Sequence, residues 1–417
     1  MTLTRLVHHV HQVRFGERTS FADGVLTVSA DEARGVLDDP ALAETRLSWV
    51  SPNESARIVK ILDAVEPRTK GPGGGGIFPG FVGPRRLQGS GETHVLRGVI
   101  VVTAGYLPRA QEALADLSGP AASLSPLGAA HNLVVEFVPA TGAGWEQVDV
   151  ALRRSSLRLA AVLAEASLAA TPDAVEELPS PSPRSRTSSL PRVGAVTNLQ
   201  TQGSFKDVFV YGRSFDAALP TLLDPGEFDD GAVVSGQFGH PALKNPTFMH
   251  QNHPVINELR RRHGRDVEFA GVVICPEPVD QGSKEMISAF AARVCDAAGF
   301  DAAIVTKEGG GNADADVALK MDALNDLGIQ PVGLYAEMAG VDGTGPSVVV
   351  APERATAMVS TGNYDHRLQL PEMERAYGGE QFTLLESPAT AALEVSTAVV
   401  YCALNPLGWG NLTASSA

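Results

Sequence analysis

The pattern of hydrophobic and polar positions divides the chain near residue 193. Beyond that point, short apolar runs alternate with segments in which apolar residues recur at helical spacing. This alternation predicts a doubly wound, mostly parallel sheet with helices on both faces. The predicted strands are 208–211, 232–235, 268–275, 302–306, 331–336 and 347–351. The predicted helices are 255–263, 283–298 and 314–327, with a final helix from Ser387 as N-cap to Ala403.

The first part of the chain has β-branched runs and one long helical pattern. Strand character is found at 3–15, 24–29, 93–102 and 131–138, and apolar residues follow a helical period over 145–170. Residues 171–192 are rich in Pro, Ser and Arg, a composition typical of a linker. We therefore expect an α/β protein. It has an N-terminal mixed α+β domain (1–170), a linker (171–192) and a Rossmann-like α/β substrate-binding domain (193–417).

A glycine-rich loop at 70–84 carries apolar side chains that a free loop rarely keeps. Ile77, Phe78, Phe81 and Val82 stand among its glycines and prolines. We expect the loop to pack on the second domain or on a partner subunit and to help close the site.

Composition narrows the function classes. The net charge of −15 excludes the basic face that nucleic acid or an anionic membrane requires. Three cysteines without a close pair favour a reducing compartment. Neither a signal peptide nor an apolar run long enough to span a membrane is evident. We expect a cytoplasmic protein.

In open parallel sheets, ligands bind beyond the carboxyl ends of the strands. The sequence places Tyr211, Glu308 and Glu337 there. The turn from Glu308 through Gly309, Gly310 and Gly311 to Asn312 opens a helix, so its N–H groups could hold a substrate carboxylate. The alternative is a plain turn with Asn312 or Asp314 as N-cap.

Three histidines, His240, His250 and His253, crowd one loop. Neutral imidazoles at such spacing could share a divalent metal with Glu277, Glu308 or Glu337. Alternatively, the histidines are solvated or bonded to the backbone.

Two further candidates are nucleophiles. Thr197, if freed by autocleavage, could attack with its own amine as base; the alternative is that it starts a strand. Among the cysteines, Cys275 ends a strand near the expected ligand site, whereas Cys295 and Cys402 are expected in helices as inert packing.

Several motifs carry a specific resemblance. They are Val-Thr-Asn-Leu-Gln-Thr-Gln-Gly (196–203), Tyr211-Gly212-Arg213, the run 233–253 with Lys244-Asn245 and His250-Gln251-Asn252, the stretch 308–316, and Gly-Val-Asp-Gly-Thr-Gly (340–345). With them the chain resembles the alpha/beta-subunit precursor of component B of the glycine, sarcosine and betaine reductases, and more distantly the D-proline reductase proprotein.

The resemblance implies a cysteine just before Lys244-Asn245 that is cut to give a pyruvoyl group. That group forms an imine with the amine, and a selenocysteine of a partner subunit attacks the activated carbon. In this chain the position falls on Ala242, which has no side-chain nucleophile. A pyruvoyl group is therefore not expected, and no other cofactor is indicated beyond the possible divalent metal.

The resulting prediction is a subunit of a component B-like reductase complex of amino-acid metabolism, acting on the C–N bond of a small amine or amino-acid derivative. It would form a hetero-oligomer with a beta-type partner. Two alternatives stay open: a metal-dependent hydrolase or lyase, and a non-catalytic scaffold subunit. The expected catalytic residues are His250, Glu308 and Thr197. The expected substrate contacts are Tyr211, Lys244, Asn245, Gly309, Gly310, Gly311, Asn312 and Glu337.

Overall fold

The computed structural model describes residues 2–108, 110–181, 188–201, 208–236, 239–354, 357–410 and 413–415. Residues 182–187 of the predicted linker lie outside this range. Also outside this range are Gln202 and Gly203 of the first motif, positions 237 and 238, and parts of the C-terminal tail. The described chain is of the α/β class, as predicted.

The second half of the chain is built on a sheet in the order β17-β19-β14-β20-β21-β22-β28, counted over the described residues. The five central strands, from β19 to β22, run parallel, and β17 and β28 pair antiparallel at the edges. The strands are β14 (Arg192–Gln200), β17 (Thr221–Leu223), β19 (Glu268–Glu277), β20 (Ala302–Thr306), β21 (Gln330–Glu337), β22 (Met358–Asn363) and β28 (Thr413–Ser415).

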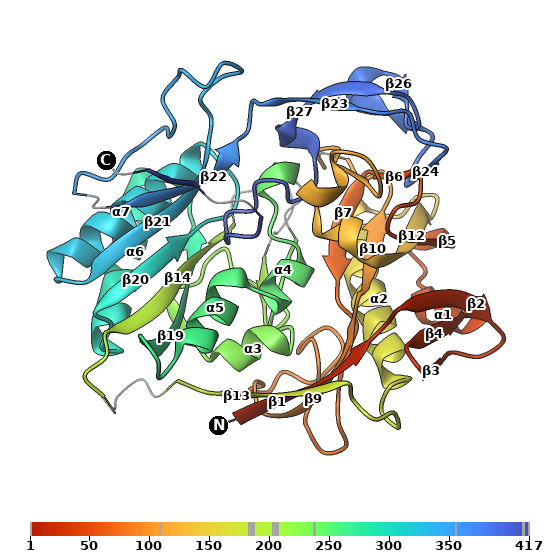
Figure 1. Ribbon diagram of the computed structural model, residues 1–417, viewed down its shortest axis with the longest axis horizontal. Coiled ribbons are helices and arrows are strands. Elements are labelled where there is room, and N and C mark those ends of the chain that lie inside the picture. The colour runs from red at the N-terminus through yellow and green to blue at the C-terminus, as the bar shows by residue number, and fades with distance from the viewer. Residues whose placement is uncertain are drawn as a thin grey trace.

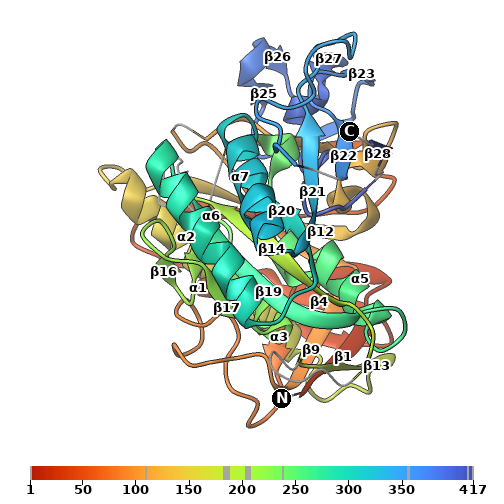
Figure 2. The ribbon, with the colours of Figure 1, turned by 90° about the vertical axis from the view of Figure 1, so that its left-hand side faces the viewer.

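Helices cover both faces of this sheet because successive strand residues point to opposite sides. Val196 packs with α6 (Gln281–Ala297) and α7 (Asn312–Asp326), which lie in front of the sheet in Figure 2. Ala195 packs on the other face with α3 (Pro225–Asp229) and α5 (Pro254–Arg262). α6 begins where the Asp280 side chain accepts from the N–H of Ser283.

The first half consists mainly of antiparallel and mixed sheets (Figure 1). Gly98, with a φ of 95°, divides the predicted strand 93–102 into β9 and β10. One sheet contains β13 (Ala174–Pro179), β1 (Thr2–His9), β9 (Gly91–Arg97) and β8 (Arg68–Lys70). Another contains β5 (Leu42–Val50), β12 (His131–Pro139), β10 (Val99–Ala104) and β7 (Ile61–Val65), and a third β2 (Gln12–Gly16), β4 (Val25–Ser29) and β3 (Ser20–Ala22).

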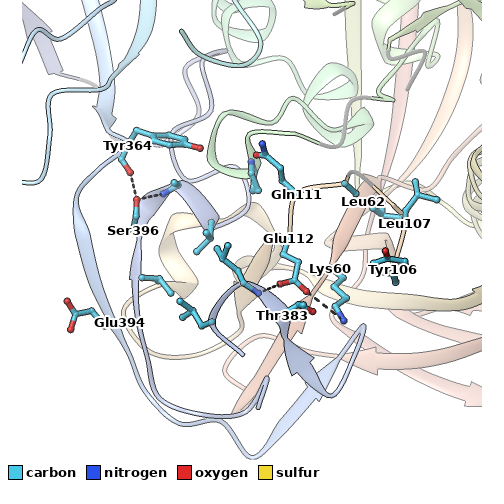
Figure 3. A pocket seen from close by; sticks show the side chains of 18 of the residues that line it. Lys60, Leu62, Tyr106, Leu107, Gln111, Glu112, Tyr364, Thr383, Glu394 and Ser396 are labelled. Carbon is cyan, nitrogen blue, oxygen red and sulfur yellow. Dashed lines mark hydrogen bonds and ion pairs between the residues drawn. The ribbon is translucent and has the colours of Figure 1, made fainter. Parts of the chain in front are cut away.

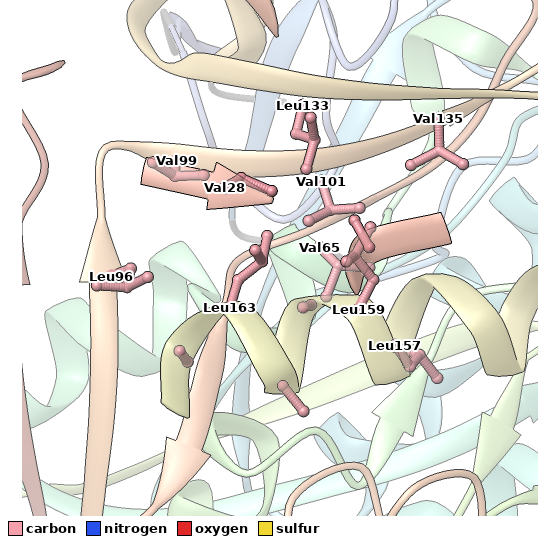
Figure 4. Close-up of a cluster of buried hydrophobic side chains, with 14 of the residues drawn as sticks. Val28, Val65, Leu96, Val99, Val101, Leu133, Val135, Leu157, Leu159 and Leu163 are labelled. Atoms are coloured by element: carbon pink, nitrogen blue, oxygen red, sulfur yellow. The ribbon is translucent and has the colours of Figure 1, made fainter. Parts of the chain in front are cut away.

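The core of this half lies under the long helix α2 (Trp145–Glu165), beside α1 (Ala30–Leu37). Leu157, Leu159 and Leu163 of α2 are at most 1% exposed and belong to one cluster with Val101 and Leu133 (Figure 4). Burial of each such side chain contributes about 1.5–3 kcal/mol. This packing fixes the position of β7, which carries a residue of the candidate site.

The C-terminal segment returns to the first half of the chain. β24 (Arg375–Tyr377) pairs with β6 (Ala56–Val59), which also pairs with β11 (Leu114–Asp116). The remaining elements are α4 (Thr247–Gln251), β15 (Phe209–Val210), β16 (Arg213–Ser214), β18 (Val233–Val234), β23 (Arg367–Leu370), β25 (Gln381–Phe382), β26 (Ser387–Pro388), β27 (Leu393–Ser396), η1 (Ala122–Leu124), η2 (Pro126–Ala129), η3 (Pro241–Leu243), η4 (Thr383–Leu385) and η5 (Thr397–Val399).

Three predictions of local structure are wrong. The segment 171–192 was expected to be an irregular linker, yet β13 lies within it and pairs with β1, and β14 begins at its end. The predicted final helix 387–403 is replaced by β26, β27 and η5, because these residues pair with other strands. The predicted strand 347–351 is not a strand, and Val349 in it is 65% exposed.

The glycine-rich loop packs as expected on the second half of the chain. Phe78 is fully buried, and its N–H donates to the carbonyl of Asp230 at 2.9 Å. Phe81 meets Phe209 edge to face with ring centroids 5.4 Å apart. Its role in closing the site stays a prediction.

No helix among the described residues is both long and apolar enough to cross a membrane.

Candidate functional site

The carboxyl ends of β14, β19 and β20 bring polar side chains together. Glu308, just beyond β20, is 1% exposed, and its carboxylate accepts from the N–H groups of Gln200 at 3.3 Å and Asn245 at 3.2 Å. Its own N–H donates to Glu277 at 3.1 Å. Burial raises the pKa of Glu277 well above its ordinary value, and the nearby Asp316 adds to this effect. Glu308 therefore joins the sheet to the segment around residue 245.

Ala242, the position where the resemblance implies a cysteine, lies in the short turn η3 and is fully buried. Its carbonyl accepts from the N–H of Leu404 at 2.9 Å, and the carbonyl of Pro241 accepts from Cys402 at 3.0 Å. His240 enters the turn with a left-handed φ of 48°. The peptide between residues 241 and 242 is thus held by the C-terminal turn 401–405.

Lys244 is 2% exposed and lies within electrostatic reach of Glu308, Asp63 and Cys402. Burial lowers the pKa of Lys244, and the two carboxylates oppose that effect. Burial also raises the pKa of the Cys402 thiol well above its ordinary value, so the sulfur is protonated at neutral pH. We call Lys244, Asp63, Glu308 and Cys402 the Lys244 cluster.

Asp63 reaches the Lys244 cluster from β7 in the first half of the chain. It accepts from the N–H of Thr247 at 3.0 Å and from the Thr247 hydroxyl at 2.7 Å. Burial raises the pKa of Asp63, while Lys244 lowers it. The cluster therefore depends on segments that are distant in the sequence.

Asn245 is fully buried, and both the nitrogen and the oxygen of its side-chain amide are hydrogen bonded. Its Nδ2 donates to the carbonyl of Lys307 at 3.0 Å, and its Oδ1 accepts from Asn405 Nδ2 at 2.7 Å. A side chain so occupied positions the Lys244 segment against β20 and the C-terminal turn. Its predicted contact with substrate stays a prediction.

The three candidate histidines do not form one group among the described residues. His253 Nε2 lies 3.1 Å from Thr197 Oγ1, and burial lowers the pKa of His253 to about 3. His250 is fully buried, its pKa lies well below the ordinary value because of that burial, and neither ring nitrogen has a hydrogen-bond partner among the described residues. His240 instead lies beside Tyr364 with ring centroids 6.4 Å apart.

Within the described ranges, no three His, Cys, Asp or Glu side chains form a group that could hold a metal ion. The predicted metal site of His240, His250 and His253 is therefore not formed by this part of the chain. Burial explains the difference, because His250 and His253 pack inward as neutral rings.

Thr197 lies inside β14 rather than at its start. Its hydroxyl accepts from Thr306 at 3.2 Å, across the parallel pair β14 and β20. A role as an amino-terminal nucleophile would require prior cleavage within a buried strand. That role stays a prediction.

Tyr211 lies elsewhere in the fold. Its hydroxyl donates to Glu227 at 2.5 Å and accepts from the N–H of Gln88 at 3.2 Å. Burial raises the pKa of Tyr211. The residue thus holds the loop around Gln88 against α3. Neither of these hydrogen bonds of its hydroxyl reaches the Lys244 cluster.

The glycine turn packs directly on the segment that contains Ala242. A Cβ at Gly309 would lie 2.6 Å from Gln200 Oε1, and one at Gly310 would lie 2.8 Å from Leu243 Cδ1. These close approaches favour glycine at positions 309 and 310, whereas at Gly311 the φ of 70° favours it. Asn312 is exposed and begins α7, and Glu337 ends β21 half-buried, so contact of either with substrate stays a prediction.

Cys275 is not accessible to a ligand. It is fully buried in the cluster under α6 and α7, and burial raises the pKa of its thiol to about 12. Cys402, by contrast, was expected in a helix but lies in a turn with a left-handed φ of 64°. Sequence reasoning missed Cys402, Asp63 and Asn405 as members of the site region, because no local motif marks them.

A cavity of about 730 Å³ opens beside Pro241 (Figure 3). One side is formed by residues 105–107 and 110–112 with Lys60 and Leu62, and the other by the C-terminal segment around Leu384, Val395 and Val399. Gln111, on the cavity wall, accepts from the N–H of His240 at 2.7 Å. The cavity therefore borders the turn that holds Ala242.

Comparison with known proteins gives a consistent result. The family model described as "Glycine/sarcosine/betaine reductase component B subunits" matches residues 1–415. The chain is 36% identical over 416 residues to "Glycine reductase complex component B subunits alpha and beta" of Peptoclostridium acidaminophilum, covering 97% of each chain. The sarcosine and betaine reductase alpha subunits of the same organism are 33% and 31% identical. The match to the sarcosine reductase subunit covers 88% of this chain and 87% of the relative. The match to the betaine reductase subunit covers 97% of each chain. No solved structure matches the chain.

Proposed function

The chain belongs to the family of glycine/sarcosine/betaine reductase component B subunits, and we propose that it serves in a heteromeric complex that cleaves the C–N bond of a small amine or amino-acid derivative. A beta-type partner subunit would supply the thiol or selenol that provides the electrons. The single observation that carries the proposal is the buried segment from Lys244 to Thr247, which follows the turn of Ala242 and is held by the carboxylates of Glu308 and Asp63.

The residues do not fit a pyruvoyl group. Such a group requires a side-chain nucleophile at the cut position, and Ala242 has none. The nearest hydroxyl downstream, that of Thr247, is bonded to Asp63. We infer that the 241–242 peptide stays intact, and no step is assigned to the missing carbonyl.

The chain's own residues would then bind and position the substrate. Lys244, within electrostatic reach of Asp63 and Glu308, would hold a proton where burial lowers its pKa and so eases the release of that proton. Glu308 fixes the segment 244–245 through the N–H of Asn245. The departing amine needs a proton, and Lys244 is the group we assign to supply it.

Reconstitution with the beta-type partner tests this proposal. The Glu308→Gln variant keeps acceptor atoms for Gln200 and Asn245 but removes the charge. We expect it to bind the partner in a pull-down and to lower amine release by about a hundredfold or more. Glu285→Gln, on the exposed side of α6, is the matched control and should retain activity.

A non-catalytic scaffold is the second candidate, favoured by the alanine at position 242. If Glu308→Gln leaves the activity of the complex unchanged, the scaffold function gains and the catalytic one fails. The metal-dependent hydrolase finds no support in the described residues.

A further inference from the structure

The cavity beside Pro241 is large for the compounds after which the relatives are named. Its volume of about 730 Å³ lies within the range of roughly 300–1,000 Å³ that holds drug-sized ligands. Glycine, sarcosine and betaine would each occupy a small part of it. A ligand that fills the cavity must carry a substantial additional group.

The cavity wall is mostly apolar, which defines the chemistry of that group. Leu62, Leu107, Val395 and Val399 are all at most 9% exposed and line it from both halves of the chain. Apolar walls gain about 25 cal/mol for each Å² of apolar ligand surface that they remove from water. An aromatic or branched aliphatic group therefore suits the cavity better than a charged one.

One carboxylate on the wall is incompletely hydrogen bonded. Glu112 Oε2 accepts from the N–H of Leu384 at 2.7 Å. Its Oε1 forms an ion pair with Lys60 Nζ at 3.7 Å, but it is buried and accepts no hydrogen bond from the described residues. Figure 3 shows this carboxylate between Lys60 and the backbone of the C-terminal segment. A ligand ammonium that takes the place of Lys60 Nζ would give Oε1 the charge-assisted hydrogen bond that it lacks.

We propose that this cavity binds an amine or amino-acid derivative with a bulky apolar substituent, with its ammonium on Glu112 and its apolar part against Leu107 and Val399. The proposal rests on the proposed function, because that function makes the substrate an amine. The proposal goes beyond that function in the size of the substrate, because the bound molecule is much larger than glycine.

Calorimetric titration of the purified full-length chain tests binding without turnover. The probes are phenethylamine and N-benzylglycine, with glycine and 3-phenylpropanoate for comparison. We expect both bulky amines to bind and glycine to give no detectable heat. 3-Phenylpropanoate, which has the apolar group without the ammonium, should bind at least about tenfold more weakly than phenethylamine. Equal binding of glycine, or no binding of either bulky amine, would overturn the proposal.

Two variants locate the binding. Glu112→Gln keeps an acceptor for the N–H of Leu384 and should weaken phenethylamine about tenfold or more while leaving 3-phenylpropanoate unchanged. Ala398→Phe should fill the cavity and weaken both probes. Ala217→Phe, at an exposed position away from the cavity, is the matched control. If Ala398→Phe does not fold, Glu112→Gln alone decides the matter, because it should weaken the binding of phenethylamine and leave that of 3-phenylpropanoate unchanged. Equal losses for both probes would contradict the role of Glu112.

Failure of this inference is distinguishable from failure of the proposed function. If the chain binds bulky amines but its complex cleaves no amine, the proposed function is contradicted and the cavity assignment stays intact. Cleavage of glycine by the complex, with no binding of bulky amines, would contradict the cavity assignment and leave the proposed function intact.

Discussion

The N–H of Cys402 donates to the carbonyl oxygen of Pro241 at 3.0 Å, which places the C-terminal turn on the peptide before Ala242. Cys402 is fully buried and adopts a left-handed φ of 64°, a conformation that costs a non-glycine residue about 1 kcal/mol or more. The surrounding contacts, including the N–H of Leu404 on the carbonyl of Ala242, outweigh this cost. The turn is thus part of the site region rather than a loose tail.

Thiol reactivity tests this burial. Cys275, Cys295 and Cys402 are all buried, and burial raises the pKa of each thiol. Because the thiolate is the reactive form, we expect none of the three to react with Ellman's reagent in the native protein, and all three to react in guanidinium chloride. Mass mapping that finds rapid native labelling of Cys402 would show that the turn is open.

A second prediction concerns the junction between the C-terminal segment and the first half of the chain. Arg57 is fully buried, forms two bonds to Asp116 at 2.6 and 3.1 Å and donates to the carbonyls of Pro371, Ala389 and Ala391. Arg57→Ala leaves the Asp116 carboxylate buried and unpaired.

We expect Arg57→Ala to lower the free energy of unfolding by about 3–5 kcal/mol in urea titrations. Arg46→Ala is the control, because the pair of Arg46 with Glu44 is exposed and such surface pairs contribute less than about 1 kcal/mol. Equal effects of the two substitutions would contradict the described packing.

The packing of the glycine-rich loop predicts a third result. Phe78→Ala removes a ring that is 0% exposed and packs against Gly231 of the second half. Truncation of a buried phenylalanine costs about 3–5 kcal/mol. Phe15→Ala, at a position 42% exposed, should change the free energy of unfolding much less. If the two substitutions lowered the free energy of unfolding equally, the loop would be free in solution and the prediction would be wrong.

The buried histidines predict a pH dependence of stability. The pKa of His253 falls to about 3 in the folded state and that of His250 also falls well below 6.5, so both rings stay neutral there while the unfolded chain takes up protons. The stability that they contribute is therefore complete above about pH 6.5 and is lost as the pH falls toward their folded values.

Each buried histidine adds about 1.4 kcal/mol per pH unit to the slope below its unfolded pKa. Urea titrations between about pH 6.5 and 4.5 measure this slope, above the range in which most carboxylates titrate. His253→Gln should reduce it, whereas His366→Gln, at an exposed position, should leave it as in the original chain. An unchanged slope in His253→Gln would show that the ring is protonated or exposed in the folded protein.

The sequence predicted the parts of the fold in which local pattern and tertiary contacts agree. The strand 302–306 and the helix that begins near Asn312 follow clear periodicity and were placed within a few residues. The predicted helix from Ser387 failed because its cap-like Ser-Pro signal is local, whereas Leu393–Ser396 pairs with a strand distant from that signal.

The site region shows the same division. Glu308, Lys244 and Asn245 belong to the motifs that indicated the family, and the family is confirmed. Their roles in catalysis and substrate binding stay predictions. Asp63 and Asn405 were missed because both are far from the motif in the sequence. Only the folded chain brings them next to it. The three histidines of the predicted metal site do not form one group within the described ranges, because their crowding in the sequence does not show which way the rings point.

Intact-mass spectrometry of the purified protein tests the central claim most directly. A component B-type chain with alanine at position 242 should give one mass, that of the uncut chain, with no ketoacyl-blocked fragment beginning near that position. The Ala242→Cys variant, measured in parallel, shows whether the surrounding turn can still support cleavage. Two fragments from the unsubstituted protein, one of them blocked by a ketoacyl group, would contradict the account.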